Sequence, residues 1–253
     1  MSREITLVLS GGAAYGSAHL GVMEVLEEKG FVVSGVAGAS VGSLVGILYA
    51  FGENVGALQE TARDLSWPDI TSLTRPDMGL LSTSKLMGWI RKRIGEVDLA
   101  DAPIPVTVVA TDLTRGTPVV FTRGDAALAV AASCAVPGLF KPVEHEGRLL
   151  VDGGLVNNLP VQLAREMDVG PVVASDLLAP AEHPVPENIF DVLLRAVNLM
   201  VGMAPSSERE EADLLITPDT GPYSSADLSR ADELMAAGRK AARRALKEKG
   251  WSE

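Results

Sequence analysis

Short apolar runs alternate along this chain with longer segments in which apolar residues recur at helical spacing. The apolar runs predict strands over Ile5–Leu9, Phe31–Ala37, Ile104–Ala110, Pro118–Phe121, Leu149–Val151, Val172–Ser175 and Leu214–Ile216. The periodic segments predict helices over Ser17–Lys29, Val41–Ala50, Gly56–Leu65, Ser84–Arg93, Ala126–Ser133, Pro160–Glu166, Asn188–Met203 and Ala226–Lys247. This alternation is typical of an α/β fold with three layers, α/β/α, around a mostly parallel central sheet.

One long segment, Ser66–Ser82, is apolar but shows neither a strand-like run nor helical spacing of its apolar residues. It contains Pro68, Pro76 and Gly79. Such a segment is typical either of a lid or binding loop or of packing over the edge of a sheet. No linker or internal repeat divides the chain, so 253 residues with 47% hydrophobic content predict one large domain over residues 1–253.

Charge and composition exclude several classes of function. The net charge of −11 argues against nucleic-acid binding. From Arg230 onward, however, seven basic residues stand against four acidic ones. These basic residues could make a transient contact with a membrane surface, or they could stabilise the C-terminal end of their own helix through its macrodipole. The chain has no apolar stretch of about 18 uncharged residues and no signal-like start, which predicts a cytoplasmic protein. Cys134 is the single cysteine, so no internal disulfide forms.

Polar residues follow several of the predicted strands, at the edge where α/β sheets bind ligands. Ser40 stands in Gly38-Ala39-Ser40-Val41-Gly42, between a predicted strand and a predicted helix. A serine on such a sharp turn projects its hydroxyl out of the backbone, and the flanking glycines, Gly38 and Gly42, allow a close approach by other segments. This pattern predicts a nucleophile.

Acyl transfer through serine also needs an oxyanion site and a proton acceptor. The small residues of Ser10–Gly16 can turn successive N–H groups toward an anion, and their spacing does not match a dinucleotide loop. Asp152 ends a predicted strand and precedes Gly153 and Gly154, which makes it the candidate acceptor. Turn-type hydrogen bonds to that carboxylate would lower its pKa.

Taken together, these motifs resemble the patatin-like phospholipase family. The resemblance rests on Leu9–Gly16, Gly38–Gly42 and Val151–Gly154 in this order, with Asn157–Pro160 after them, and it covers nearly the whole chain. It implies a patatin-like fold and hydrolysis of lipid acyl esters, with a lipid or small ester as substrate. The family mechanism uses a Ser-Asp dyad and a covalent acyl-enzyme without histidine.

Position by position, the resemblance implies Ser40 as nucleophile and Asp152 as proton acceptor. It implies the amides of Gly11, Gly12 and Ala13 as the oxyanion hole. No cofactor or metal is implied, and no calcium-loop or histidine-ligand spacing is visible.

The chain departs from the family pattern in the oxyanion loop. Ala13 replaces a glycine and disfavours a positive φ, and Tyr15 stands where an arginine is expected. Since tyrosine carries no positive charge, we expect a weaker preference for phosphate-bearing substrates.

Three alternatives to this function follow from the sequence. One is a Ser-His-Asp hydrolase using Ser40, Asp152 or Asp176, and His183, in the chain order of that class. Another is a catalytically weak regulatory or lipid-binding protein, suggested by the altered loop, and a third is acyl transfer to an acceptor other than water. For the dyad, kcat/KM is expected to fall with acid in the carboxylate range, whereas an inflection at 6.5 to 7 indicates histidine.

Overall fold

The computed structural model describes residues 3–75, 77–202 and 207–251. Within them an eight-stranded sheet has the order β11-β10-β1-β2-β5-β9-β8, and β6 also pairs with β5. Its strands are β1 (Arg3–Leu9), β2 (Phe31–Ala39), β5 (Val106–Asp112), β6 (Thr117–Phe121), β8 (Val143–His145), β9 (Arg148–Asp152), β10 (Val172–Ser175) and β11 (Leu214–Ile216).

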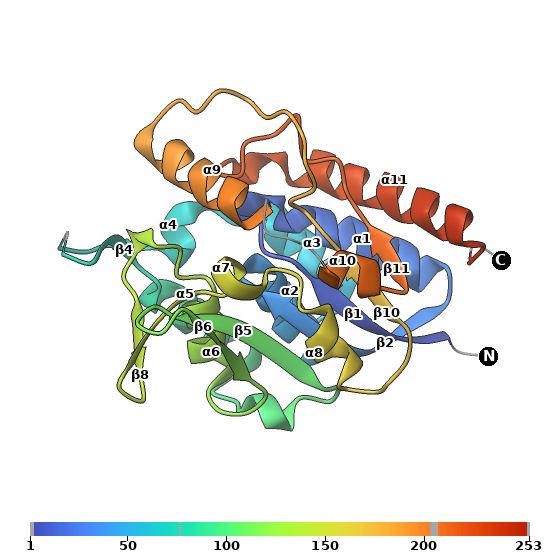
Figure 1. The fold of residues 1–253 in the computed structure, drawn as a ribbon, viewed down its shortest axis with the longest axis horizontal. Coiled ribbons are helices and arrows are strands. Elements are labelled where there is room, and N and C mark those ends of the chain that lie inside the picture. The colour runs from blue at the N-terminus through green and yellow to red at the C-terminus, as the bar shows by residue number, and fades with distance from the viewer. Residues whose placement is uncertain (1–2, 76, 203–206, 252–253) are drawn as a thin grey trace.

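Helices connect most of these strands (Figure 1). The α-helices are α1 (Ser17–Glu28), α2 (Val41–Ala50), α3 (Val55–Asp64), α4 (Trp67–Ile70), α5 (Ser84–Ile94), α6 (Ala126–Ser133), α7 (Gly154–Asn157), α8 (Val161–Arg165), α9 (Ile189–Gly202), α10 (Ser207–Glu211) and α11 (Ala231–Lys249). The 3₁₀ turns are η1 (Ala13–Gly16), η2 (Leu99–Asp101) and η3 (Leu228–Arg230). The predicted helix end at Met203 lies outside the described residues.

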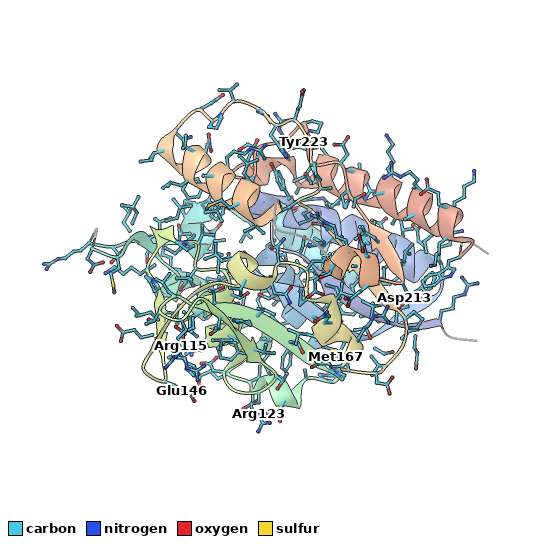
Figure 2. The ribbon with its side chains drawn as sticks, viewed as in Figure 1. Arg115, Arg123, Glu146, Met167, Asp213 and Tyr223 are labelled. Carbon is cyan, nitrogen blue, oxygen red and sulfur yellow. The ribbon has the colours of Figure 1, made fainter. Side chains whose placement is uncertain are left out.

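Alternation along β1 shows why the sheet has helices on both faces. Ile5, Leu7 and Leu9 are buried in the main core, together with side chains from α1, α2 and α6. Val8 points to the other face and packs with Val161 of α8, where Met167 also lies (Figure 2). Because successive residues of a strand face opposite ways, this pattern requires two covering layers. The α/β/α prediction is confirmed.

The C-terminal helix α11 lies along α1, as Figure 1 shows. Arg239 of α11 binds Glu24 at 3.0 Å, and Arg243 binds Glu28 at 3.1 Å. These two basic side chains therefore stabilise a helix pair within the protein. Among the described residues, no helix combines the length and the apolar character needed to cross a bilayer.

The segment Ser66–Ser82 contains more regular structure than its sequence predicts. It forms the short helix α4 and the strands β3 (Ser72–Leu73) and β4 (Gly79–Ser82). β4 pairs in parallel with β7 (Gly138–Phe140), which makes a second sheet of order β3-β4-β7. The partner strand lies more than fifty residues away in the chain, so the local pattern carries no sign of the pairing.

The part of the sheet that contains β5, β9 and β8 is antiparallel, unlike the parallel part from β11 to β5. The β5–β6 and β8–β9 hairpin turns carry the charged residues Arg115 and Glu146, and Figure 2 shows both at the periphery, with Arg123 of the β6–α6 connection. This antiparallel edge is what brings the end of β9 to the end of β2.

Candidate active site

The strand register places Ser40 opposite Asp152. β2 runs parallel to β5 and ends with Ala39 paired to Val109. β9 runs antiparallel to β5 and ends with Asp152 paired to Ala110, the next residue of β5. Since β6 pairs with β5 over the same residues, β2 and β9 share the other side of β5 and meet end to end. The two strand ends thus bring their terminal side chains together.

Ser40 occupies a strained turn at the start of α2. Its backbone has φ 50° and ψ −129°, which a residue with a Cβ rarely adopts. The Ser40 N–H donates to Ser133 Oγ at 2.7 Å, and Ser133 Oγ donates to the Val109 carbonyl at 2.6 Å. These buried hydrogen bonds tie the turn to β5 and hold the strained conformation.

The Ser40 hydroxyl donates to Asp152 Oδ2 at 2.6 Å. The other carboxylate oxygen, Oδ1, accepts a hydrogen bond from the Gly154 N–H at 2.8 Å. Both side chains are buried. One oxygen is therefore fixed by the backbone, and the other is directed at the serine, as a general base requires.

Burial raises the pKa of Asp152 to about 6, against hydrogen bonds from Ser40 and Gly154 that lower it. The sequence-based expectation of a lowered pKa is wrong, because the loss of hydration outweighs the two hydrogen bonds. The raised pKa makes this carboxylate a stronger base than an exposed aspartate. It also means that an inflection close to 6 does not by itself identify a histidine.

Glycines on both motifs permit close backbone contacts around the site. A Cβ on Gly42 would stand 2.1 Å from the Leu9 carbonyl oxygen, and one on Gly153 would stand 2.0 Å from that of Val109. A Cβ on Gly38 would also meet the backbone of α2 at 2.7 Å. Gly154 contributes the amide that holds Asp152. Side chains at the first three positions would displace α2 from the ends of β1 and β2, and the turn after Asp152 from β5.

The loop before α1 lies beside Ser40, and Ala13 has a φ of 51°. This is the conformation that its Cβ disfavours. The N–H groups of Gly12 and Ala13 have no hydrogen-bond partner among the residues that the structure describes. The Gly11 N–H donates to Asn158 Oδ1 at 3.0 Å. Two of the three predicted oxyanion donors are thus unengaged, and the third is held by a side chain.

Tyr15 is buried and points away from Ser40. Its hydroxyl lies 2.9 Å from His183 Nδ1 and donates to the Tyr223 carbonyl at 2.9 Å. It belongs to the wall of a separate polar cavity.

The three histidines have other partners. His19 is buried, with Nδ1 at 2.8 Å from Ser175 Oγ and Nε2 at 2.9 Å from the Ser10 carbonyl, and burial lowers its pKa to about 4. His183 stacks on Tyr15, and His145 lies against Phe121. Within the described part of the chain, no histidine contacts Ser40 or Asp152.

Asp176, the other candidate acid, pairs with Arg209 at 2.5 Å. It also accepts the Leu178 N–H at 3.0 Å. Neither contact involves a histidine, so the described residues contain no Ser-His-Asp arrangement at this site.

An apolar cavity of 80 Å³ opens beside Ser40. Its wall includes Val41 and Leu44 of α2, Trp67 of α4, Phe140 of β7 and Leu194 of α9. Trp67 also contacts Phe190 edge to face, with ring centroids 5.2 Å apart. The site can therefore take an apolar group next to the serine.

Some residues that shape the site were not predicted. Ser133 orients the Ser40 amide, Asn158 holds the Gly11 amide, and Thr111 Oγ1 donates to the Asp152 carbonyl at 2.7 Å. Asn158 lies in the stretch Asn157–Pro160, and Thr111 directly follows the predicted strand Ile104–Ala110. Ser133 sits in an alanine-rich helix and has no distinguishing pattern. Among the described residues, no group of His, Cys, Asp and Glu is arranged to hold a metal ion.

A sequence model described as patatin-like phospholipase matches residues 7–165, which include Ser40 and Asp152. The chain belongs to the patatin-like phospholipase family. The predicted family is therefore confirmed. The solved structure of VipD from Legionella pneumophila is similar, with a TM-score of 0.67 and 16% identity over 98% of this chain and 67% of that one. This likeness supports the patatin-like fold.

Curated relatives of this patatin-like chain include an uncharacterized NTE family protein of Mycobacterium tuberculosis, 35% identical over 79% of this chain and 56% of the relative. A lysophospholipase of Mycosarcoma maydis is 37% identical over 68% of this chain and 10% of its own. A neuropathy target esterase of Drosophila melanogaster is 32% identical over 68% of this chain and 13% of its own. The chain spans about half the length of the mycobacterial relative and a small part of the other two.

Proposed function

We propose that the chain is a serine acyl hydrolase that cleaves lipid or small carboxylic esters through Ser40 and Asp152. The observation that carries this proposal is the 2.6 Å hydrogen bond from Ser40 Oγ to Asp152 Oδ2, beside an apolar cavity. The relatives named as a lysophospholipase and an esterase support a lipid ester as the substrate.

In the proposed reaction Ser40 Oγ attacks the ester carbonyl carbon, and its proton passes to Asp152 Oδ2. The C–O bond to the alcohol then breaks, and the departing oxygen takes that proton. Water attacks the acyl-Ser40 ester, gives a proton to Asp152, and releases the acid as the Ser40 oxygen regains the proton. The fixed Oδ1 of Asp152 keeps Oδ2 directed at the reacting oxygen throughout.

The negative oxygen of each tetrahedral intermediate is proposed to bind the N–H groups of Gly12 and Ala13, which have no other recorded partner among the described residues. Gly11 joins them when the Asn158 side chain releases its amide. The positive φ of Ala13 turns its amide at a cost in strain that a glycine would avoid.

We further propose that residues 66–82 act as a binding segment at a lipid surface. Trp67 and Ile70 line the Ser40 cavity, and Leu73 and Met78 at the β3–β4 turn are exposed. Figure 1 shows this turn projecting from the body of the molecule. An apolar tip beside the mouth of the cavity would place the serine at the water–lipid boundary.

Turnover of a soluble medium-chain ester and of a lysophospholipid tests the hydrolase proposal. Wild type is expected to hydrolyse both, and Ser40→Ala and Asp152→Asn are expected to lose at least about 10³-fold in kcat/KM. His183→Ala is the matched control and is expected to keep most of the activity. A comparable loss in His183→Ala would favour the Ser-His-Asp alternative.

Folded wild type that binds lipid but hydrolyses neither ester would favour the non-catalytic, lipid-binding alternative. Transfer to an acceptor other than water would appear as an acylated alcohol when glycerol is added.

A further inference from the structure

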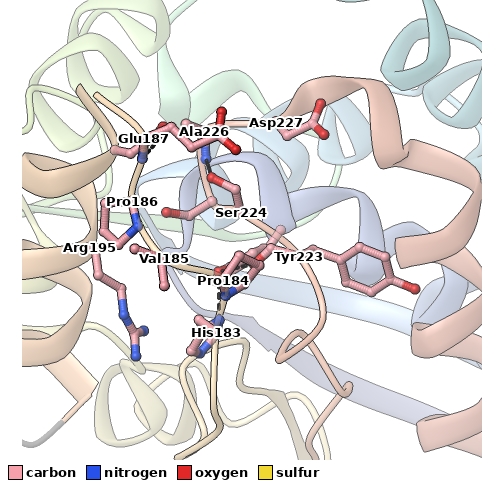
Figure 3. Close-up of a pocket in the computed structure, with 13 residues that line it drawn as sticks. His183, Pro184, Val185, Pro186, Glu187, Arg195, Tyr223, Ser224, Ala226 and Asp227 are labelled. Carbon is pink, nitrogen blue, oxygen red and sulfur yellow. Dashed lines mark hydrogen bonds between the residues drawn. The ribbon is translucent and has the colours of Figure 1, made fainter. Parts of the chain in front are cut away.

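A second cavity of 360 Å³ lies beyond the oxyanion loop (Figure 3). Its wall is formed by Tyr15, by residues 183–187, by Asp191 and Arg195 of α9, and by residues 223–227. This volume is within the range of small-ligand sites. Neither Ser40 nor Asp152 lines it, so the catalytic proposal leaves it without a role.

One end of this cavity carries a positive charge. Tyr15 gives its one proton to the Tyr223 carbonyl, so His183 Nδ1, 2.9 Å from the same hydroxyl, acts as the donor to Tyr15. In this neutral ring Nδ1 carries the proton, so Nε2 is an acceptor and cannot donate to an anion. The Arg195 guanidinium lies beside the ring, as Figure 3 shows, and burial together with this positive charge lowers the pKa of His183. Arg195 has no ion-pair partner among the described residues.

The other end of the cavity carries carboxylates. Figure 3 shows Glu187 and Asp227 away from Arg195 and His183. Asp227 is engaged by Ser229 and Arg230 within its own turn, and Asp191 accepts from the Glu187 N–H at the start of α9. The Glu187 carboxylate has no such partner within the described residues. One cation and one anion therefore face the same cavity without pairing to each other.

The polar cavity and the Ser40 cavity share walls. Leu194 lines the Ser40 cavity, and the next residue of α9, Arg195, lines the polar one. In η1, similarly, Ala13 lines the Ser40 cavity and Tyr15 lines the polar one. Trp67 Nε1–H, in the wall of the Ser40 cavity, donates a hydrogen bond at 2.7 Å to the carbonyl of Ala226, in the wall of the polar cavity. The two cavities therefore lie on opposite sides of the same segments, η1 and α9.

We propose that the polar cavity binds a zwitterionic phosphate head group, with the phosphate at Arg195 and the ammonium at Glu187. A guanidinium suits phosphate oxygens, and a free carboxylate suits a substituted ammonium. Arg195 supplies from α9 the positive charge that Tyr15 does not supply from the loop. The assignment rests on the proposed function, because it takes the head group to belong to the ester substrate.

The test measures binding to the Ser40→Ala protein by calorimetry, so that it does not depend on turnover. The ligands are hexanoyl lysophosphatidylcholine and hexanoyl glycerol, which differ only in the head group. We expect the phosphocholine ligand to bind more tightly, and Arg195→Gln to weaken it about tenfold while changing hexanoyl glycerol by less than about twofold. Glu187→Gln should weaken the phosphocholine ligand but not hexanoyl lysophosphatidate, which has no ammonium.

Arg123→Gln is the matched control, since Arg123 is an exposed arginine on a distant turn (Figure 2), and it should change neither affinity. Arg195→Lys should restore part of the affinity. Equal weakening of both ligands by Arg195→Gln would overturn the assignment, as would inorganic phosphate binding as tightly as free phosphocholine. If wild type hydrolyses no ester but the binding pattern holds, the proposed function fails and the head-group site stands.

Discussion

At the scale of single residues, two strained positions face each other across the site. Ser40 has φ 50° and Ala13 has φ 51°, and neither has the freedom of glycine. At Ser40 the strain is held by the Ser133 and Val109 hydrogen bonds, and it directs the hydroxyl at Asp152. The strain at Ala13 can be predicted from the sequence, because an alanine stands where the family pattern has a glycine and its Cβ disfavours a positive φ.

The pH dependence of hydrolysis follows from the raised pKa of Asp152. The carboxylate must be ionised to accept the Ser40 proton, and its ionised fraction falls as pH falls through about 6. We expect kcat/KM for a soluble ester to be flat above pH 7 and to fall about tenfold per unit well below 6. His183→Ala should show the same profile, and an inflection that vanishes in that variant would assign the base to histidine.

Ala13→Gly should stabilise the protein by about 1 kcal/mol, because glycine adopts the positive φ without strain and this outweighs its larger unfolded-state entropy. Urea unfolding measures the change. Ala14→Gly is the neighbouring control: Ala14 lies in η1 without a positive φ, so that substitution should destabilise by roughly 0.5–1 kcal/mol. Equal destabilisation by both would show that the Ala13 backbone is unstrained.

At the scale of elements, local pattern predicts which segments form strands and helices but not how distant strands pair. Val41–Ala50, Ala126–Ser133, Val172–Ser175 and Leu214–Ile216 form with the predicted bounds. A mostly parallel sheet is the reason to expect Asp152 at the same edge as Ser40, whereas β9 is antiparallel to β5. The residue reaches Ser40 because β9 covers only the last part of β5. That register is set by tertiary packing, as is the β4–β7 pair.

The β3–β4 turn gives a prediction at this scale. The double variant Leu73→Glu, Met78→Glu should bind phosphatidylcholine vesicles at least about fivefold more weakly, because both apolar side chains are exposed and would lose their transfer into lipid. Vesicle co-sedimentation measures the loss. Val120→Glu is the control, an exposed apolar residue of β6. Equal loss in the control would contradict a binding role for the turn.

At the scale of the whole molecule, the site is assembled at the expense of stability. Ionised Asp152 is buried, and its pKa rises from 3.8 to about 6 on folding. The folded state therefore holds its proton to higher pH than the unfolded chain, so folding is progressively weakened as pH rises from about 4 to 6. The arrangement of the glycine motifs predicts where this residue lies. Its burial, which sets the pKa, depends on side chains from throughout the chain and is not visible in the motif.

Asp152→Asn should therefore stabilise the protein at pH 8 by up to about 3 kcal/mol. The gain should shrink as pH falls through about 6 and vanish below about pH 3, where the carboxyl is protonated in both states. The asparagine can still accept from Gly154 and contact Ser40. Asp112→Asn is the opposite control, because Arg115 and backbone hydrogen bonds lower the pKa of Asp112 and its substitution should destabilise at pH 8. A gain in stability that is the same at pH 4 and pH 8 would contradict the linkage to Asp152.

Covalent labelling tests the central claim, an activated Ser40, most directly. Wild type, Ser40→Ala and Asp152→Asn are exposed in parallel to a fluorophosphonate, and intact mass is followed over time. We expect one adduct on wild type, none on Ser40→Ala and a much slower reaction of Asp152→Asn, since Asp152 removes the serine proton. An adduct that persists on Ser40→Ala, or no adduct on folded wild type, would contradict the account.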